Sequence, residues 1–168
     1  MSEEVLNKVA MSPLETLDLA TFYPKEQIIL FDLKPYLYME LIIKEKEFRA
    51  ALLATDWTLY QDKIVAVICT ADAIIPVWAY MLLASYLEPV AQDIIMGDEK
   101  IALEQSLMKR INAIDINDFK DKKVVVKGCG DLPIGDFAFM EITKKLRPVS
   151  KSIMYGEPCS TVPIYKRK

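Results

Sequence analysis

The stretch that decides the fold is Lys63–Leu87, KIVAVICTADAIIPVWAYMLLASYL. It opens with a short apolar run, Ile64–Ile68, whose β-branched residues favour a fully buried strand. Residues 77–87 continue with an apolar pattern of helical spacing, and between the two segments lie one thiol, Cys69, and one carboxylate, Asp72. In an open α/β sheet, ligands bind at the carboxyl ends of the strands, so this junction marks the place where a site is expected.

The same alternation of strand and helix continues to the end of the chain. Apolar runs begin near Ile64, Ile94, Val124 and Ile153, at intervals of about 30 residues, the length of a strand–helix–strand unit. Helical patterns lie between them at residues 77–87, 99–112 and 136–146. Because such alternation gives parallel sheets, the sequence predicts an α/β fold of three layers, with a mostly parallel sheet and helices on both faces. The repetition is expected to be of architecture rather than of sequence.

The first third of the chain is predicted to be a strand-rich N-terminal extension. Gln27–Leu33 reads as a strand, Tyr36–Ile43 as a second strand, and Lys44–Thr55 as an amphipathic helix. We therefore expect a single α/β domain over residues 1–168, in which residues 1–60 form the extension and its helix, and residues 61–168 form the repeated strand–helix units.

Composition excludes several classes of function. A net charge of −3 gives no basic footprint for nucleic acid or for an acidic membrane surface. The N-terminus lacks the unbroken apolar core of a signal peptide, and the apolar stretch 64–87 holds Asp72 and Pro76, which are costly in lipid. The chain has no histidine, which removes Ser-His-Asp and Cys-His catalysis and histidine-based zinc sites. We expect a soluble, cytoplasmic protein.

The three cysteines form the main candidate site. Cys69 and Cys129 each end a predicted strand, and Cys159 follows the last one. In the common strand order 2-1-3-4 these strands are neighbours, so the three thiols are expected to converge at one edge of the sheet. Three thiolates suit zinc with an open fourth position, copper(I) or an iron–sulfur cluster. Zinc or an iron–sulfur cluster is the expected cofactor.

Nearby polar residues fit such a site. Asp72 and Asp131 each follow a cysteine closely, and either is a candidate oxygen ligand. Lys127 is placed to lower the pKa of a nearby thiol. The leading hypothesis is therefore a metal- or iron–sulfur-binding accessory protein.

Two alternatives remain open. One is an enzyme or sulfur carrier that uses a single reactive thiolate, Cys159 or Cys129. The other is a protein-interaction module whose cysteines are buried core residues, since free cysteine is among the residue types most often buried.

Several segments resemble a known family. They are CTADAIIPVWAYMLL at residues 69–83, VVVKGCG at 124–130 and SIMYGEPCSTVPIYK at 152–166, together with NKVA and LDL near the start. These segments resemble a family of small bacterial proteins described as a domain of unknown function, and among them GEPCSTVPIY is specific. The resemblance implies a role near sulfur or iron–sulfur cluster handling, with iron–sulfur assembly proteins as partners, and it assigns no catalytic residue.

Overall fold

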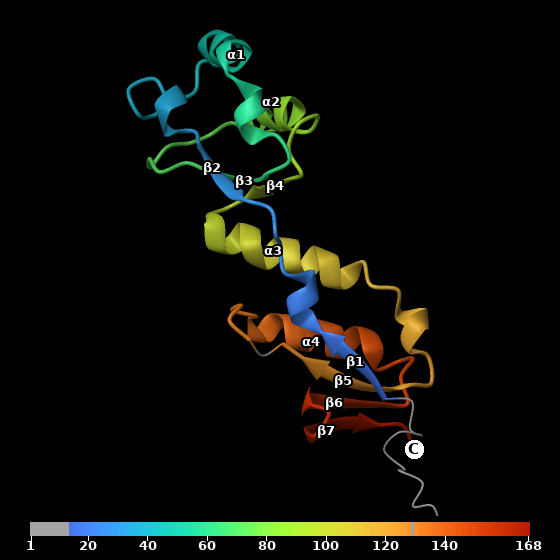
Figure 1. Ribbon diagram of the computed structural model, residues 1–168. Helices are drawn as coiled ribbons and strands as arrows, with labels where there is room; N and C mark the ends of the chain where they lie inside the picture. Colours follow the sequence, from blue (N-terminus) through green and yellow to red (C-terminus); the bar gives the residue numbers. More distant parts are fainter. Residues whose placement is uncertain (1–13, 129) are drawn as a thin grey trace, which may run out of the picture. The chain divides into compact units, whose positions relative to one another are not determined.

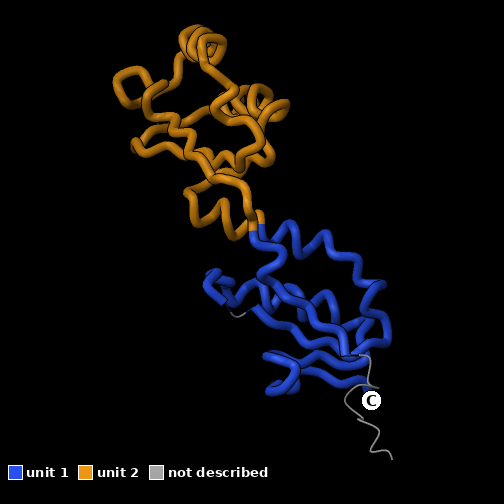
Figure 2. The backbone as a smooth tube through the Cα atoms, viewed as in Figure 1, with its two compact units in different colours: residues 1–23, 107–168 blue, residues 24–106 orange. Residues whose placement is uncertain are grey.

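The computed structural model describes residues 14–128 and 130–168, which form two compact units (Figure 2). Unit 1 takes its described residues from 14–23 and from 107–168, and unit 2 consists of residues 24–106. The described chain therefore passes from unit 1 through the whole of unit 2 and returns to complete unit 1. Helix α3 (Glu99–Asn112) includes the boundary between them.

Unit 2 is built on three parallel strands in the order β2–β3–β4 (Figure 1). The strands are β2 (Ile28–Asp32), β3 (Ile64–Ile68) and β4 (Asp93–Met96). The crossovers between them contain α1 (Glu45–Ala54) and α2 (Val77–Leu87), with short 3-10 helices η2 (Lys34–Tyr36) and η3 (Trp57–Tyr60). Since strands adjacent in the sheet are also consecutive in the chain, right-handed crossovers place α1 and α2 on one face.

The main core of unit 2 lies between that face and the two helices. Val65 and Val67 of β3 point into it, and the helices contribute buried residues that include Phe48, Leu52, Ala79, Leu83 and Leu87. The opposite face of the sheet carries a smaller cluster that includes Ala102 of α3. Helices therefore cover both faces of this sheet, as the sequence predicts.

Unit 1 has four strands in the order β1–β5–β6–β7. They are β1 (Leu14–Asp18), β5 (Lys123–Lys127), β6 (Ser152–Glu157) and β7 (Ser160–Lys166). The first three are parallel, and β7 forms an antiparallel hairpin with β6. Residues of α3 and of α4 (Asp136–Leu146) pack on this sheet in one core, with η1 (Leu19–Phe22) and η4 (Ile116–Phe119) at its ends.

The two units share one sequence pattern. Residues 56–98 of unit 2 align without a gap with residues 115–157 of unit 1. Identical pairs include Asp62-Lys63 and Asp121-Lys122, Val65 and Val124, Asp72 and Asp131, Ala79 and Ala138, Met81 and Met140, Pro89-Val90 and Pro148-Val149, and Gly97 and Gly156. The expectation that only the architecture repeats is therefore wrong, because the chain contains an internal sequence repeat.

Backbone geometry repeats together with the sequence. Asp62 and Asp121 both adopt positive φ, at 57° and 59°. The N–H of Asp62 donates to the carbonyl of Val90, and the N–H of Asp121 donates to that of Val149, each at 2.9 Å. Positive φ is uncommon for residues other than glycine, so its presence at both aligned positions indicates that the two units share this turn. The two units can thus be compared residue by residue.

Most of the predicted elements are confirmed. The fold is α/β with mostly parallel strands, and the helices at 77–87, 99–112 and 136–146 are present. The predicted strand Tyr36–Ile43 is wrong: it is replaced by η2 and a tight loop closed by the pair Tyr38 and Ile42, with positive φ at Met39 and Glu40. The expected order 2-1-3-4 is also wrong, because β3 and β4 lie in one sheet, and β5 and β6 in the other.

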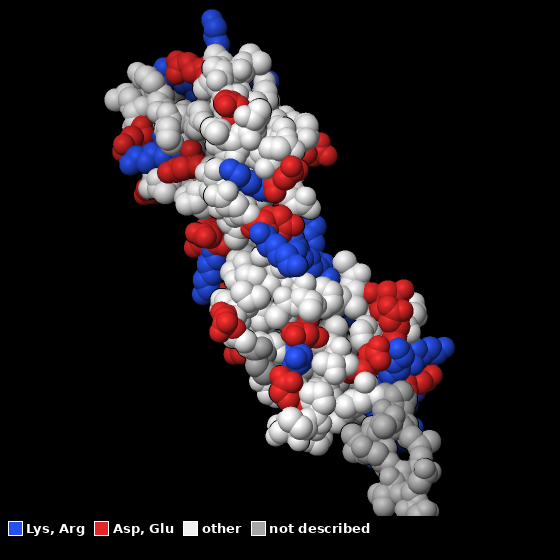
Figure 3. Space-filling model, viewed as in Figure 1, with Lys and Arg blue, Asp and Glu red and all other residues white. Residues whose placement is uncertain are grey.

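Two surface properties complete the description. On the face shown in Figure 3, acidic and basic side chains are intermixed in each unit, and neither sign forms a continuous field. No helix within residues 14–128 and 130–168 is both long and apolar enough to span a bilayer.

Candidate functional site

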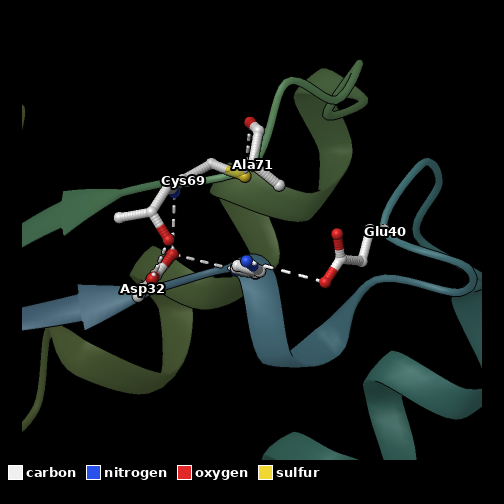
Figure 4. A network of polar contacts seen from close by, with 6 residues as sticks. Asp32, Glu40, Cys69 and Ala71 are labelled. Carbon is white, nitrogen blue, oxygen red and sulfur yellow. Dashed lines mark hydrogen bonds and ion pairs between the residues drawn. The ribbon is translucent and has the colours of Figure 1, made fainter.

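The carboxyl ends of β2 and β3 in unit 2 hold a closed network of polar contacts (Figure 4). One carboxylate oxygen of Asp32 accepts hydrogen bonds from the backbone N–H of Lys34 at 2.9 Å and of Thr70 at 3.0 Å. The other oxygen accepts from the hydroxyl of Thr70 at 2.5 Å. The amino group of Lys34 reaches Glu40 at 3.5 Å. The Asp32 carboxylate thus ties the ends of two neighbouring strands together.

This network lowers the pKa of Asp32. Partial burial on its own acts to raise the pKa, but the hydrogen bonds from Thr70 and from the backbone of Lys34 and Thr70 outweigh it and leave the pKa below its ordinary value of 3.8. A carboxylate satisfied in this way is suited to holding strand ends in place, and it has little capacity left for a ligand.

Cys69 directly follows β3, and its side chain belongs to the core of unit 2. The thiol is half-buried, packs against the main core cluster and donates to the carbonyl of Ala71 at 3.5 Å. Burial raises the pKa of nearby Tyr80, and an electrostatic interaction with Cys69 adds to that effect. Asp72, three residues further on, is exposed.

The same edge of unit 1 is arranged differently. Asp18 ends β1 in the sequence LDL, as Asp32 ends β2 in FDL, and its carboxylate accepts from the backbone N–H of Ala20 at 2.9 Å. Lys127, at the end of β5, lies 3.6 Å from the Asp18 carboxylate and 3.7 Å from that of Glu157. The ends of β1, β5 and β6 are therefore joined by one lysine between two carboxylates.

The two remaining cysteines follow these strands. Cys159 is exposed in the turn between β6 and β7. The hairpin requires Gly156, whose φ is 120° and where a Cβ would lie 2.6 Å from the carbonyl oxygen of Ser160. Cys129 is next after Gly128 in the sequence and lies outside the described residues, so its predicted role stays a prediction. Asp131 is exposed.

The alignment of the units separates the three cysteines. Cys69 aligns with Gly128, and Cys129 aligns with Thr70. At Gly128 a Cβ would lie 2.7 Å from Cζ of Phe139, the residue aligned with Tyr80. Position 69 thus contributes a side chain to the core of unit 2 where unit 1 leaves room for an aromatic ring. The premise that all three cysteines end neighbouring strands is wrong, because β3 belongs to a different sheet from β5 and β6.

A metal ion needs several ligand side chains that converge on one point. Within residues 14–128 and 130–168, no three Cys, Asp or Glu side chains come together in a group that can hold a metal. At the carboxyl ends of the unit 1 strands the described residues instead hold Lys127 between two carboxylates, and the exposed thiol of Cys159 lies in the hairpin turn that follows Glu157.

A comparison with protein families places the chain. The profile of the family Protein of unknown function (DUF2480) matches residues 3–167. The chain belongs to this family. Comparisons with curated proteins and with solved structures find no match.

Reasoning from the sequence missed several polar residues of this DUF2480 protein. Asp18, Asp32, Thr70 and Glu157 were not candidates, and Lys127 was considered only as a cation near a thiol. The signal that finds the two aspartates is the recurrence of LDL and FDL, which lie outside the aligned segments 56–98 and 115–157 and place Asp18 and Asp32 at the ends of β1 and β2. A single copy of either tripeptide carries no such information.

Proposed function

We propose that this protein is a thiol-dependent accessory protein of sulfur or iron–sulfur cluster handling, in which Cys159 accepts sulfur from a persulfide donor. One observation carries the proposal: Cys159 is exposed in the turn of a hairpin that only unit 1 possesses. In unit 2 the sheet ends at β4, and the chain enters α3 instead of turning back. The resemblance described above supplies the sulfur context.

The chemical step needs only one accessible thiolate. The thiolate of Cys159 attacks the outer sulfur of the donor persulfide, the S–S bond of the donor breaks, and the donor leaves as a thiolate. Cys159 then carries the outer sulfur as a persulfide, and the proton lost from its thiol passes to the departing thiolate or to water. No further oxidant or reductant is required. A second protein then removes the sulfur by the same exchange.

Accessibility distinguishes Cys159 from Cys69. An attacking thiolate must reach a sulfur on another protein, and reaction rates follow exposure as well as thiolate character. The Cys69 thiol is half-buried against the core of unit 2 and donates a hydrogen bond to the backbone carbonyl of Ala71. We therefore assign Cys69 to packing and the carrier role to Cys159.

Metal or cluster binding is the second candidate. One observation favours it: Lys127 and Glu157 join the ends of β5 and β6 at 3.7 Å, and each precedes a cysteine by two residues. Cys129 and Cys159, with Asp131 as an oxygen donor, then form the ligand set for zinc or an iron–sulfur cluster. Cys69 and Asp72 are left out of this ligand set, because they follow β3, which lies in a different sheet from β5 and β6.

Persulfide transfer to the full chain tests the proposal. The protein and its Cys69→Ser, Cys129→Ser and Cys159→Ser variants are treated with glutathione persulfide, and intact mass is measured. We expect the wild type and Cys69→Ser to gain one sulfur atom and Cys159→Ser to gain none. Sulfur on Cys69 in the wild type contradicts the proposal. Metal that copurifies anaerobically, and is lost on replacing either Cys129 or Cys159, selects the second candidate instead.

A further inference from the structure

An open hollow lies on unit 1 beside the hairpin that carries Cys159. It has a volume of about 260 Å³ and lies between α4 and the β6–β7 hairpin. The residues that line this unit 1 hollow include Asp136, Phe139, Thr143, Ile153, Tyr155 and Ile164. Sites that enclose a whole small-molecule ligand measure roughly 300–1,000 Å³. The hollow is smaller than these and suits a single apolar side chain.

Apolar side chains continue from the hollow over the hairpin. Tyr155 of β6 is 43% exposed, and Val162 and Ile164 of β7 are 56% and 51% exposed. Tyr155 and Val162 are paired across the hairpin, so they lie on the same face of the sheet. Phe139 of α4 packs edge-on against Tyr155, with ring centroids 5.6 Å apart, and forms the wall on the helix side. This surface is apolar, and its residues come from α4, β6 and β7.

The rim of the hollow carries one carboxylate, that of Asp136. Asp136 is exposed in the first turn of α4, and no cation of the described residues forms an ion pair with it. Lys127, the basic residue at the end of β5, is already held by Asp18 and Glu157. A partner that places a lysine or arginine at this rim therefore meets an available carboxylate.

The separation between the hollow and Cys159 limits what can use both. Tyr155 precedes Cys159 by four residues, and a strand rises about 3.3 Å per residue, so the two lie within about 13 Å along the hairpin. An extended segment spans the same distance with three or four residues. A segment with an apolar side chain in the hollow can therefore present its own cysteine to Cys159.

We propose that the unit 1 hollow docks an apolar side chain of the partner protein that exchanges sulfur with Cys159. The anchoring residue lies three or four residues from the partner's cysteine, and an adjacent lysine or arginine pairs with Asp136. This inference rests on the proposed function, and it names how the partner is recognised.

Peptide disulfides provide the probe. The first peptide has a lysine–leucine pair, with the leucine three residues before its cysteine. The second peptide has serine in place of the leucine. In both peptides the cysteine is activated as a 2-pyridyl disulfide. The rate of reaction with Cys159 is followed in the Cys69→Ser/Cys129→Ser protein by release of 2-thiopyridone. We expect the leucine peptide to react about tenfold faster, as suits burial of one such side chain.

Two matched variants locate the effect. Ile164→Thr, in the hollow, should abolish the preference for leucine, whereas Val162→Thr, on the same strand but outside the hollow, should retain it. Asp136→Asn should remove the advantage of a peptide with lysine over one with alanine at that position. Equal rates for leucine and serine peptides, or equal losses in both threonine variants, overturn the inference. A concentration-dependent dimer that Ile164→Thr disrupts also overturns it, since the occupant is then a second copy.

Binding without chemistry separates this inference from the proposed function. A leucine peptide with serine in place of cysteine is titrated into the Cys159→Ser protein, and amide shifts at Tyr155 and Ile164 are followed by NMR. Shifts that the serine-for-leucine peptide does not produce support docking even if persulfide transfer fails. Successful persulfide transfer without such shifts retains the carrier and removes the docking site.

Discussion

A methyl group added at Gly128 should destabilise unit 1. The Cβ of Gly128→Ala would lie 2.7 Å from Cζ of Phe139 and 3.5 Å from Cβ of Leu19. Carbon atoms pack best at about 3.5–4.0 Å, so the ring must move by close to 1 Å. Its freedom is limited, because Phe139 also packs edge-on against Tyr155. Overpacking of this kind costs about 1–3 kcal/mol.

The free energy of unfolding is measured by urea denaturation followed by circular dichroism. The matched control is Cys69→Ala at the aligned position of unit 2, which keeps a Cβ and loses only a half-buried sulfur, so its loss should be below about 1 kcal/mol. Phe139→Leu should relieve the clash, and the double variant should then be more stable than the sum of the single changes predicts. A Gly128→Ala protein as stable as the wild type, with additive double-variant energies, refutes the equivalence of positions 69 and 128.

Two further changes test the comparison of the units. Asp32→Asn should lower the free energy of unfolding by about 1–2 kcal/mol at neutral pH. Because the pKa of Asp32 in the folded protein is lowered from 3.8, the stabilisation by its carboxylate is complete above that value and is lost as the pH falls below it. The urea midpoints of the variant and the wild type should therefore converge in acid, and a difference that stays constant with pH contradicts the assignment. Ser150→Ala should raise the free energy of unfolding by about 1 kcal/mol, because its fully buried hydroxyl has no hydrogen-bond partner among the described residues. Unit 2 has Ala91 at the aligned position. A lower urea midpoint for Ser150→Ala than for the wild type contradicts this prediction.

The sequence predicts local elements well because their signals are local. Hydrophobic periodicity places α2, α3 and α4 at the residues where the structure has them, and the β-branched run Ile64–Ile68 is a strand. Tyr36–Ile43 has a strand-like composition but no neighbour to pair with, and the loop instead closes on itself through Tyr38 and Ile42. Composition in a short segment cannot supply a hydrogen-bonding partner.

Strand neighbours are harder to predict because they depend on the whole chain. A regular series of strand–helix units is compatible with one sheet or with two, and no single residue distinguishes them. The distinguishing information is that β1 pairs with β5 and β2 pairs with β3, across a chain that leaves unit 1 and returns to it. The three-cysteine metal site was predicted on the assumption that β3, β5 and β6 are neighbours in one sheet. That assumption is wrong, although each of these strands was predicted correctly.

Because the two units share a sequence repeat, the strand ends of unit 1 can be compared position by position with those of unit 2. Both units keep an aspartate at the end of the first strand, but in unit 2 Thr70 closes the edge by bonding to Asp32. In unit 1 the residue aligned with Thr70 is Cys129, and Lys127 stands where unit 2 has the apolar Ile68. Lys127 takes over the task of holding Asp18 and adds Glu157. Lys127 thus fills in unit 1 the structural role that Thr70 fills in unit 2, and position 129 carries a thiol in place of the Thr70 hydroxyl. The thiols of unit 1 are therefore the residues on which functional experiments should concentrate.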